Sequence, residues 1–220
     1  MLKKISTMIS IFSLLLIFSF SIQASDVIQF LDSDLKVALL RQLGKSPNDE
    51  ISIAEAENAP QTLDLSQASI SNLEGIQYFK NVTFLKLHEN NIQDLTPLSN
   101  LTKLKILLLN DNLMEDIGPL ANLKNVTLLN LNNNQVTNLQ MLKSIPHMHY
   151  LYISHNKVND ITPLDHFKEL DFFDYSFNQI SDISSINNLT ELRYGDINSQ
   201  AIYLPSQTIK KVNLLSLLIQ

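Results

Sequence analysis

Hydrophobic residues recur along this chain with a period of 22 positions. The stretch 85–104 reads L-x-L-x-x-N-x-I-x-x-L-x-x-L-x-x-L-x-x-L, and sliding it by 22 residues superimposes it on the stretches that follow. The first leucine of each unit has its counterparts at Leu63, Leu85, Leu107, Leu129, Leu151 and Phe173. The asparagine of each unit recurs at Asn90, Asn112, Asn134, Asn156 and Asn178. Because several further apolar positions keep the same phase, the pattern predicts a protein built from stacked repeats.

Each unit has the features of one turn of a leucine-rich-repeat solenoid. The L-x-L segment is typical of a short strand whose leucines point inward and whose other residues point outward. The asparagine amide is both donor and acceptor, so it can satisfy backbone groups that the buried bend after the strand leaves unpaired. Pro97, Pro119 and Pro163 share one position in the remaining, apolar part of the unit, which indicates short 3-10 or extended convex returns. The expected fold is an α/β repeat solenoid, curved, with a parallel concave β-sheet.

The chain divides into four predicted segments. Residues 1–24 have Lys3 and Lys4 ahead of an apolar run and end in Ala24, which is typical of a secretory signal peptide. Residues 25–60 are expected to form a helical N-terminal cap, and residues 61–205 to hold about six to seven repeats. Residues 206–220 are a short apolar tail, expected to fold back on the last repeat. Because the first apolar run is short for a membrane span, we expect a secreted protein with no membrane span after cleavage.

The predicted cap carries two helix signals that the repeats lack. Asp32 or Ser33 can begin a first helix, which Gly44 would end. Ser52 and Glu55 have the spacing of a capping box, which opens a second helix that ends before Pro60. These helices are expected to cover the apolar edge of the first repeat.

Charge and cysteine content narrow the functional class. The formal net charge is −6, with 16 basic and 22 acidic residues, so a phosphate backbone is disfavoured and we expect no nucleic-acid partner. The chain contains no cysteine. Secreted repeat proteins of animals and plants usually close their ends with disulfide-bonded caps, so the sequence is more typical of a bacterial secreted protein.

Catalytic and cofactor motifs are missing from the sequence. There is no cysteine nucleophile, no Gly-x-Ser-x-Gly and no glycine-rich phosphate loop. His147, His149, His155 and His166 occupy different repeat positions without the spacing of metal ligands. We therefore expect a protein that is not an enzyme and that uses no cofactor or metal.

From the first residue to about Pro205 the chain resembles the internalins and related secreted leucine-rich-repeat proteins of Gram-positive bacteria. The resemblance is carried by the signal peptide, by the cap sequence DSDLKVALLRQLGK and by the 22-residue repeats that begin TLDLSQASISNLEGIQYFKNV. A phrase I-x-D-L/I-x-P-L around Ile92, Ile161 and, in part, Met114 adds to it. The resemblance implies a curved solenoid whose concave sheet binds host surface proteins. It also implies that residues near Pro205 stand where internalins pass into an immunoglobulin-like domain, of which residues 206–220 would be a truncated junction.

The outward positions of the strands form the candidate binding site. One position per strand is large and apolar in six consecutive repeats, although outward strand positions should read polar. Such a stripe indicates an interaction surface, and aromatic residues dominate the energetics of interfaces. The candidate partner-binding residues are Phe84, Lys86, Ile106, Leu108, Leu128, Tyr150, Tyr152, Phe172, Asp174, Tyr194 and Asp196. They are expected to project into solvent, with Asp174 and Asp196 as an acidic rim that attracts a basic partner.

The sequence thus favours a secreted, monomeric, protein-binding module of the adhesion or virulence type. Two alternatives remain open. The first is an intracellular leucine-rich-repeat scaffold that regulates an enzyme such as a phosphatase, which the signal peptide argues against. The second is a non-functional, truncated internalin remnant, which the shortness of the tail after Pro205 suggests.

Overall fold

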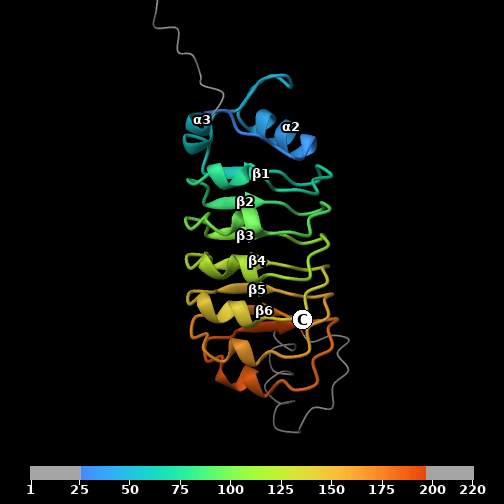
Figure 1. Ribbon diagram of the computed structural model, residues 1–220. Coiled ribbons are helices and arrows are strands. Elements are labelled where there is room, and N and C mark those ends of the chain that lie inside the picture. Colours follow the sequence, from blue (N-terminus) through green and yellow to red (C-terminus); the bar gives the residue numbers. More distant parts are fainter. Residues whose placement is uncertain (1–25, 197–220) are drawn as a thin grey trace, which may run out of the picture.

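Seven parallel strands of three residues each form a single open sheet in a computed structural model that describes residues 26–196 (Figure 1). Neighbours in the sheet are neighbours in the chain, and each strand pairs with the residues 22 positions later, as Leu85 does with Leu107. The strands are β1 (Thr62–Asp64), β2 (Phe84–Lys86), β3 (Ile106–Leu108), β4 (Leu128–Asn130), β5 (Tyr150–Tyr152), β6 (Phe172–Asp174) and β7 (Tyr194–Asp196). The predicted leucine-rich-repeat solenoid with its curved sheet is confirmed.

Short 3-10 turns return the chain from one strand to the next on the convex side. They are η2 (Ile76–Tyr78), η3 (Thr96–Leu98), η4 (Gly118–Asn122), η5 (Gln140–Ser144), η6 (Thr162–Leu164) and η7 (Ser184–Asn188). Proline lies in the first two positions of η3, η4 and η6, as the shared proline position predicts. An aspartate or asparagine opens most of these turns; for example, Asp94 accepts a hydrogen bond from the backbone N–H of Thr96 at 2.8 Å.

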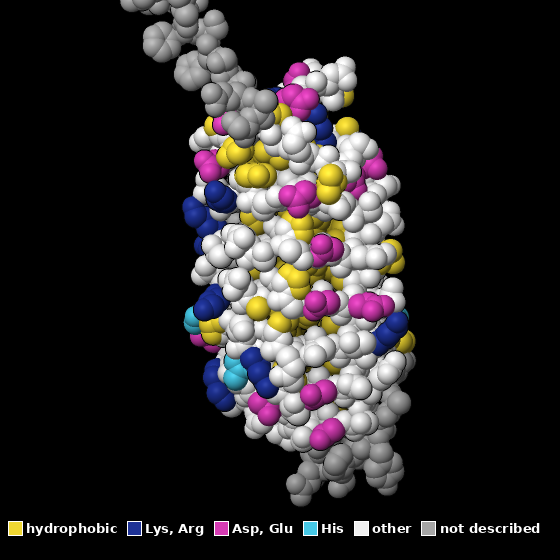
Figure 2. Space-filling view, viewed as in Figure 1, with side chains coloured by type: hydrophobic (Ala, Val, Ile, Leu, Met, Phe, Trp, Pro, Cys, Tyr) yellow, Lys and Arg dark blue, Asp and Glu magenta, His cyan; other side chains and the backbone are white. Residues whose placement is uncertain are grey.

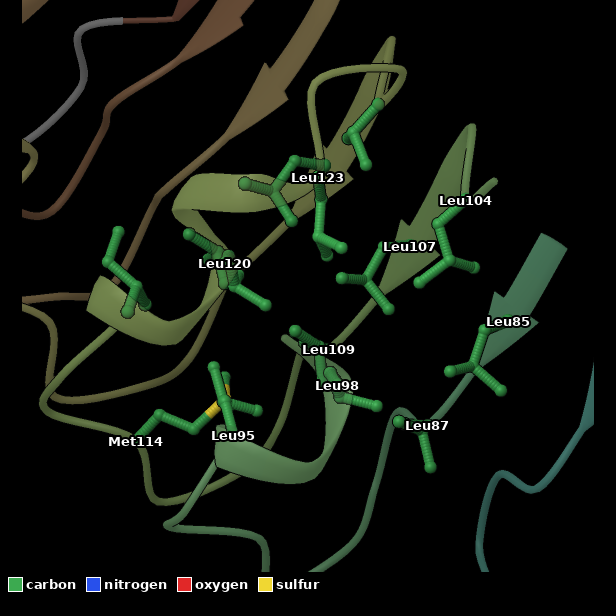
Figure 3. Close-up of a cluster of buried hydrophobic side chains, with 14 of the residues drawn as sticks. Leu85, Leu87, Leu95, Leu98, Leu104, Leu107, Leu109, Met114, Leu120 and Leu123 are labelled. Carbon is green, nitrogen blue, oxygen red and sulfur yellow. The ribbon is translucent and has the colours of Figure 1, made fainter. Parts of the chain in front are cut away.

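The hydrophobic core is one continuous column between the sheet and the convex turns. Figure 3 shows leucines of successive repeats, such as Leu85, Leu87, Leu107 and Leu109, meeting Leu98 and Leu120 of the turns. All of these side chains are fully buried or nearly so. Because a single repeat covers only one side of its own core residues, this burial depends on stacking.

The asparagine ladder has the structural role that the sequence predicts. Asn134 donates from Nδ2 to the carbonyl oxygens of Leu109 and Leu131, both at 3.0 Å, and its Oδ1 accepts from the backbone N–H of Met114 at 3.2 Å. Equivalent bonds recur at Asn90, Asn112, Asn156 and Asn178, all of them buried. Each amide therefore joins its own repeat to the one before it.

The residue just before each ladder asparagine has a left-handed backbone conformation, although none of these residues is glycine. In five consecutive repeats φ lies between 51° and 58°. These residues are Glu89, Asp111, Asn133, His155 and Phe177. A side chain in this region is energetically unfavourable, so the stacked neighbours must hold the bend in place.

Two helices, α2 (Ser33–Gln42) and α3 (Ile53–Glu57), cover the first repeat: α2 lies against β1 and α3 against η2. Asp32 is the N-cap of α2, and Ser52 and Glu55 form the predicted capping box of α3. The Gln42 side chain accepts a hydrogen bond from the backbone N–H of Asp64 at 3.3 Å, so the cap meets the edge of β1. The predicted signal peptide (1–24) and tail (206–220) lie outside the described residues. Among residues 26–196, no helix combines the length and apolarity that a membrane crossing requires.

Candidate functional site

The concave face carries three rows of side chains that run across the strands. The first row consists of the register partners on β2 to β6, which are Phe84, Ile106, Leu128, Tyr150 and Phe172. The second row is Asp64, Lys86, Leu108, Asn130, Tyr152 and Asp174. The third row is Ser66, His88, Asn110, Asn132, Ser154 and Ser176, at the ends of the strands. The backbone of β7 continues the first two rows at Tyr194 and Asp196, whose side chains lie outside what the structure describes.

The first row is only partly exposed, which differs from the expectation that these side chains project freely into solvent. Tyr150 is 42% exposed, whereas the other four side chains are half-buried. One reason is lateral packing on the sheet: the rings of Tyr152 and Phe172 lie 4.8 Å apart and 32° from parallel. At the other end of the row, the Lys86 ammonium lies 5.6 Å from the centre of the Phe84 ring. The first row is therefore an apolar surface whose side chains pack against their neighbours on the sheet and are only partly exposed to solvent.

Lys86 is already paired within the sheet. Its Nζ lies 2.9 Å from Oδ2 of Asp64, the register partner on β1. A hydrogen bond from the Ser66 hydroxyl, together with this ammonium, lowers the pKa of the Asp64 carboxyl to about 2. The charges at this end of the concave face therefore neutralise each other, and Lys86 offers a partner its aliphatic stem more than a free charge.

The carboxyl-terminal end of the described face combines aromatic and acidic groups. Asp174 accepts a hydrogen bond from the Ser176 hydroxyl at 2.8 Å and pairs with no described cation. Burial, with smaller effects of Tyr150 and Asp174, raises the pKa of the Tyr152 hydroxyl. Tyr152 is therefore neutral at physiological pH, and it can donate a hydrogen bond to a partner.

The third row uses much of its hydrogen-bonding capacity within the sheet. Asn132 Oδ1 accepts from the backbone N–H of Ser154 at 2.7 Å, and Asn110 donates to the Asp111 carboxylate at 2.7 Å. Ser66 and Ser176 each bond the aspartate two residues earlier. His88 is the exception, because its Nδ1 is buried without a hydrogen-bond partner among the described residues. Because the other polar groups named here already have partners, apolar contact with the first row is the larger source of binding energy that the face offers.

Two arrangements on the margins of the sheet were missed by the sequence reasoning. The rings of His155 and Phe177 stack 4.1 Å apart, 10° from parallel, and Phe177 is 44% exposed. His149 Nδ1 lies 3.3 Å from Oδ2 of Asp171, and Arg193 Nε lies 3.5 Å from Oδ1 of the same carboxylate. Both arrangements could have been found in the sequence by comparing residues 22 positions apart, since residues at the same repeat position are stacked neighbours.

Within residues 26–196, no three His, Cys, Asp or Glu side chains are grouped so that they could hold a metal ion. His147 and His149 both face Glu169, at 3.2 and 3.7 Å, while His155 and His166 lie elsewhere. The arrangement on the concave face suits contact with another macromolecule.

Comparison with known proteins agrees with this geometry. Residues 102–144 and 124–166 match the family described as Leucine Rich repeats (2 copies). The structure is similar to that of internalin C2 from Listeria monocytogenes, with 33% sequence identity and a TM-score of 0.63, over 80% of this chain and 88% of that one. The chain belongs to the internalin family.

Two further internalin structures from Listeria monocytogenes are similar to it. InlF is 28% identical with a TM-score of 0.66, over 83% of this chain and 60% of that one. The functional domain of InlJ, which includes a cysteine ladder, is 21% identical with a TM-score of 0.59, over 83% and 54%, and shares the fold. Among the curated proteins compared with the chain, none matches it significantly.

Proposed function

We propose that this internalin is a secreted, non-catalytic module that binds a protein on a host or cell surface through its concave face. The observation that carries the proposal is the first row, a run of five apolar side chains across five adjacent strands, widened by Leu108 and Tyr152. The repeat fold of the family supports it, because internalin-like leucine-rich repeats are protein-interaction modules.

The aromatic half of the row is expected to contribute most of the free energy of binding to a partner. Tyr150 and Phe172 are register partners, the rings of Tyr152 and Phe172 lie 4.8 Å apart, and Tyr150 is the most exposed side chain of the first row. Aromatic anchors of this kind cost about 2 kcal/mol or more each when truncated to alanine in an interface. Ile106, Leu108 and Leu128 extend the contact area toward the cap, and Asp174 places a negative charge where a basic group of the partner can approach.

Capture of cell-surface proteins tests the proposal. The wild-type protein, a Tyr150→Ala/Phe172→Ala variant and a Leu113→Ala control would be incubated with labelled surface proteins, and bound proteins quantified. Leu113 is a matched control because it is 40% exposed and lies beyond the strands, after the ladder asparagine. We expect the double variant to lose a protein that both other forms retain. Equal capture by all three forms, at equal folded fractions, would exclude the concave row as the binding site.

The site of action separates this proposal from the alternative of an intracellular scaffold. The protein should be recovered from the medium of the producing cell with Ser25 as its first residue. Recovery from the cytosol with residues 1–24 still attached would favour the scaffold instead.

A further inference from the structure

Lysines gather along one margin of the convex side, at the end of a 3-10 turn or between a 3-10 turn and the strand that follows it. In the view of Figure 2, Lys and Arg side chains lie mainly along one side of the molecule, while Asp and Glu side chains run down its middle. We define the lysine row as Lys80, Lys103, Lys105, Lys124 and Lys143, all exposed. They occupy the segments 77–83, 99–105, 121–127 and 143–149, which contain no aspartate or glutamate.

Most of the lysine row lacks carboxylate partners. Lys80 lies 3.4 Å from Glu57, and Lys103 donates to the side-chain oxygen of Asn81. Lys105, Lys124 and Lys143 form no ion pair with any residue in the range 26–196. The lysines of the cap differ, since Lys36 pairs with Glu50 and Lys45 with Glu55. A row of unpaired positive charge on an acidic protein is a local departure from its net charge of −6.

Shallow hollows bring these lysines beside polar groups, which are neutral in the first hollow and include the Glu57 carboxylate in the second. One hollow of about 470 Å³ is lined by Lys124, Lys143, Asn122, Ser144, Ala121 and Pro146. A second, of about 400 Å³, is lined by Lys80, Lys103, Asn81, Asn100, Thr102 and Glu57. Hydroxyl and amide groups next to an ammonium suit a ligand that carries both hydroxyls and anionic groups.

The neighbouring aspartates have a different role. Asp94, Asp116, Asp160 and Asp182 each accept a hydrogen bond from the backbone N–H two residues on, at 2.7–2.8 Å, and so open the 3-10 turns. Hydrogen bonds from Thr96 and Ser184 hold the pKa values of Asp94 and Asp182 below their ordinary range. Asp94 and Asp182 therefore stay ionised. The row of aspartates repels an anion from the middle of the convex side, which confines the anion to the margin.

We infer that the lysine row is a second binding surface and that its ligand is an acidic polysaccharide. Lys143 lies in η5 and Lys124 just after η4, away from the concave strands, so the ligand and a protein partner can bind at the same time. A nucleic acid fits less well, because single strands are held by aromatic side chains that stack on bases, and neither hollow is lined by one. Binding to a linear anion by several lysines is mainly electrostatic and should weaken steeply with added salt.

The inference is tested with heparin as the acidic polysaccharide, dextran as a neutral one and single-stranded DNA as the other class of polyanion. Binding of the full protein would be measured at several salt concentrations. A Lys124→Gln/Lys143→Gln variant is compared with a Lys36→Gln/Lys157→Gln control, which has the same net charge but changes lysines outside the row. Melting curves of both variants establish that they are folded.

We expect heparin to bind with a strong salt dependence, dextran not to bind, and DNA to bind more weakly than heparin. The row variant should lose about fivefold or more in heparin affinity, while the control stays within about twofold of wild type. Absence of heparin binding at low salt, or equal losses in the two variants, would overturn the inference. Binding of DNA as tight as that of heparin would overturn the assignment to a polysaccharide.

Discussion

The Asp32 carboxylate accepts two hydrogen bonds from Ser71, which lies 39 residues later, at 2.7 Å from the backbone N–H and 2.9 Å from the hydroxyl. The same carboxylate accepts hydrogen bonds from the backbone N–H groups of Asp34 and Leu35 at the start of α2, and from that of Asn72 in the first repeat. One side chain thus begins the cap helix and attaches it to the solenoid.

Replacement of Asp32 by alanine should therefore destabilise the protein more than the loss of an ordinary helix cap. An N-cap contributes about 0.5–2 kcal/mol, and the bonds to Ser71 and Asn72 would be lost as well, so we expect a loss of about 2–3 kcal/mol. Urea unfolding measures the loss. Asp34→Ala removes a neighbouring exposed carboxylate and should cost less than about 1 kcal/mol; an equal loss in both variants would contradict the attachment.

The contribution of Asp32 should disappear in acid. Burial opposes its ionisation, but hydrogen bonds from Ser71, Asn72 and Leu35 hold the pKa of this carboxyl below its ordinary value. In the unfolded chain its pKa is about 3.9. The stability it supplies is thus fully present above that pH and is lost as the pH falls through the lower folded pKa. The difference in unfolding free energy between wild type and Asp32→Asn should shrink from pH 6 to pH 2, and a constant difference would contradict the linkage.

The strand positions and their register were predictable because one period of 22 residues sets both. Once Leu85 and Leu107 occupy the same repeat position, their pairing in the sheet follows. The capping box of Ser52 and Glu55 was predictable for a similar reason, since it depends on a local spacing. The contact between Asp32 and Ser71 was not, because it joins two segments that share no pattern.

The candidate site was predictable in outline only. The repeat places Tyr150 and Phe172 on the outward face. How much of each side chain is exposed depends on diagonal neighbours such as Tyr152, and the repeat pattern does not predict these contacts. The left-handed conformation of Phe177 was also missed, because phenylalanine does not favour it. There the stacked backbone overrides the local preference of the residue.

Substitution of a ladder asparagine should be costly, and aspartate should be the worse replacement. Asn134→Ala leaves the buried N–H of Met114 without its partner. It also removes one of the two amide hydrogen bonds to each of the carbonyl groups of Leu109 and Leu131, so we expect a loss of about 1–3 kcal/mol. Asn134→Asp places a negative oxygen against those carbonyls and should cost more. Asn159→Ala, at an exposed position, serves as the control in thermal unfolding. If Asn134→Ala has the same melting temperature as this control, the ladder adds nothing to stability.

The left-handed position of Glu89 provides a test of backbone conformation that leaves the core untouched. Its φ is 55°, and its carboxylate accepts a hydrogen bond from the exposed side-chain amide of Gln67. A β-branched residue is disfavoured there, so Glu89→Val should destabilise the protein by about 1–2 kcal/mol. Glu89→Gly should stay within a few tenths of wild type. Equal melting temperatures for the two variants would show that the bend is relaxed.

Adjacent residues of β5 should separate stability from binding. Leu151 is completely buried, and Leu151→Ala should cost about 2–5 kcal/mol of stability. Tyr150 is 42% exposed, and Tyr150→Ala should cost less than about 1 kcal/mol while weakening the partner complex. Chemical unfolding and a binding titration, both made on the folded protein, check the pair. A larger stability loss for Tyr150 than for Leu151 would place Tyr150 in the core.

The arrangement of strands in chain order also determines how the molecule responds to force. Leu87, Leu109 and Leu131 each donate a backbone hydrogen bond at 2.8 Å to the following repeat, and the sheet joins each strand only to its neighbours in the chain. Tension applied to one end therefore loads one repeat boundary at a time. Each turn that peels away lengthens the tether by 22 residues, about 75 Å of extended chain. A partner bound across several strands contacts repeats on both sides of those boundaries. These repeats can separate only when contacts with the partner are also lost, so the bound complex should resist unwinding more than the free protein.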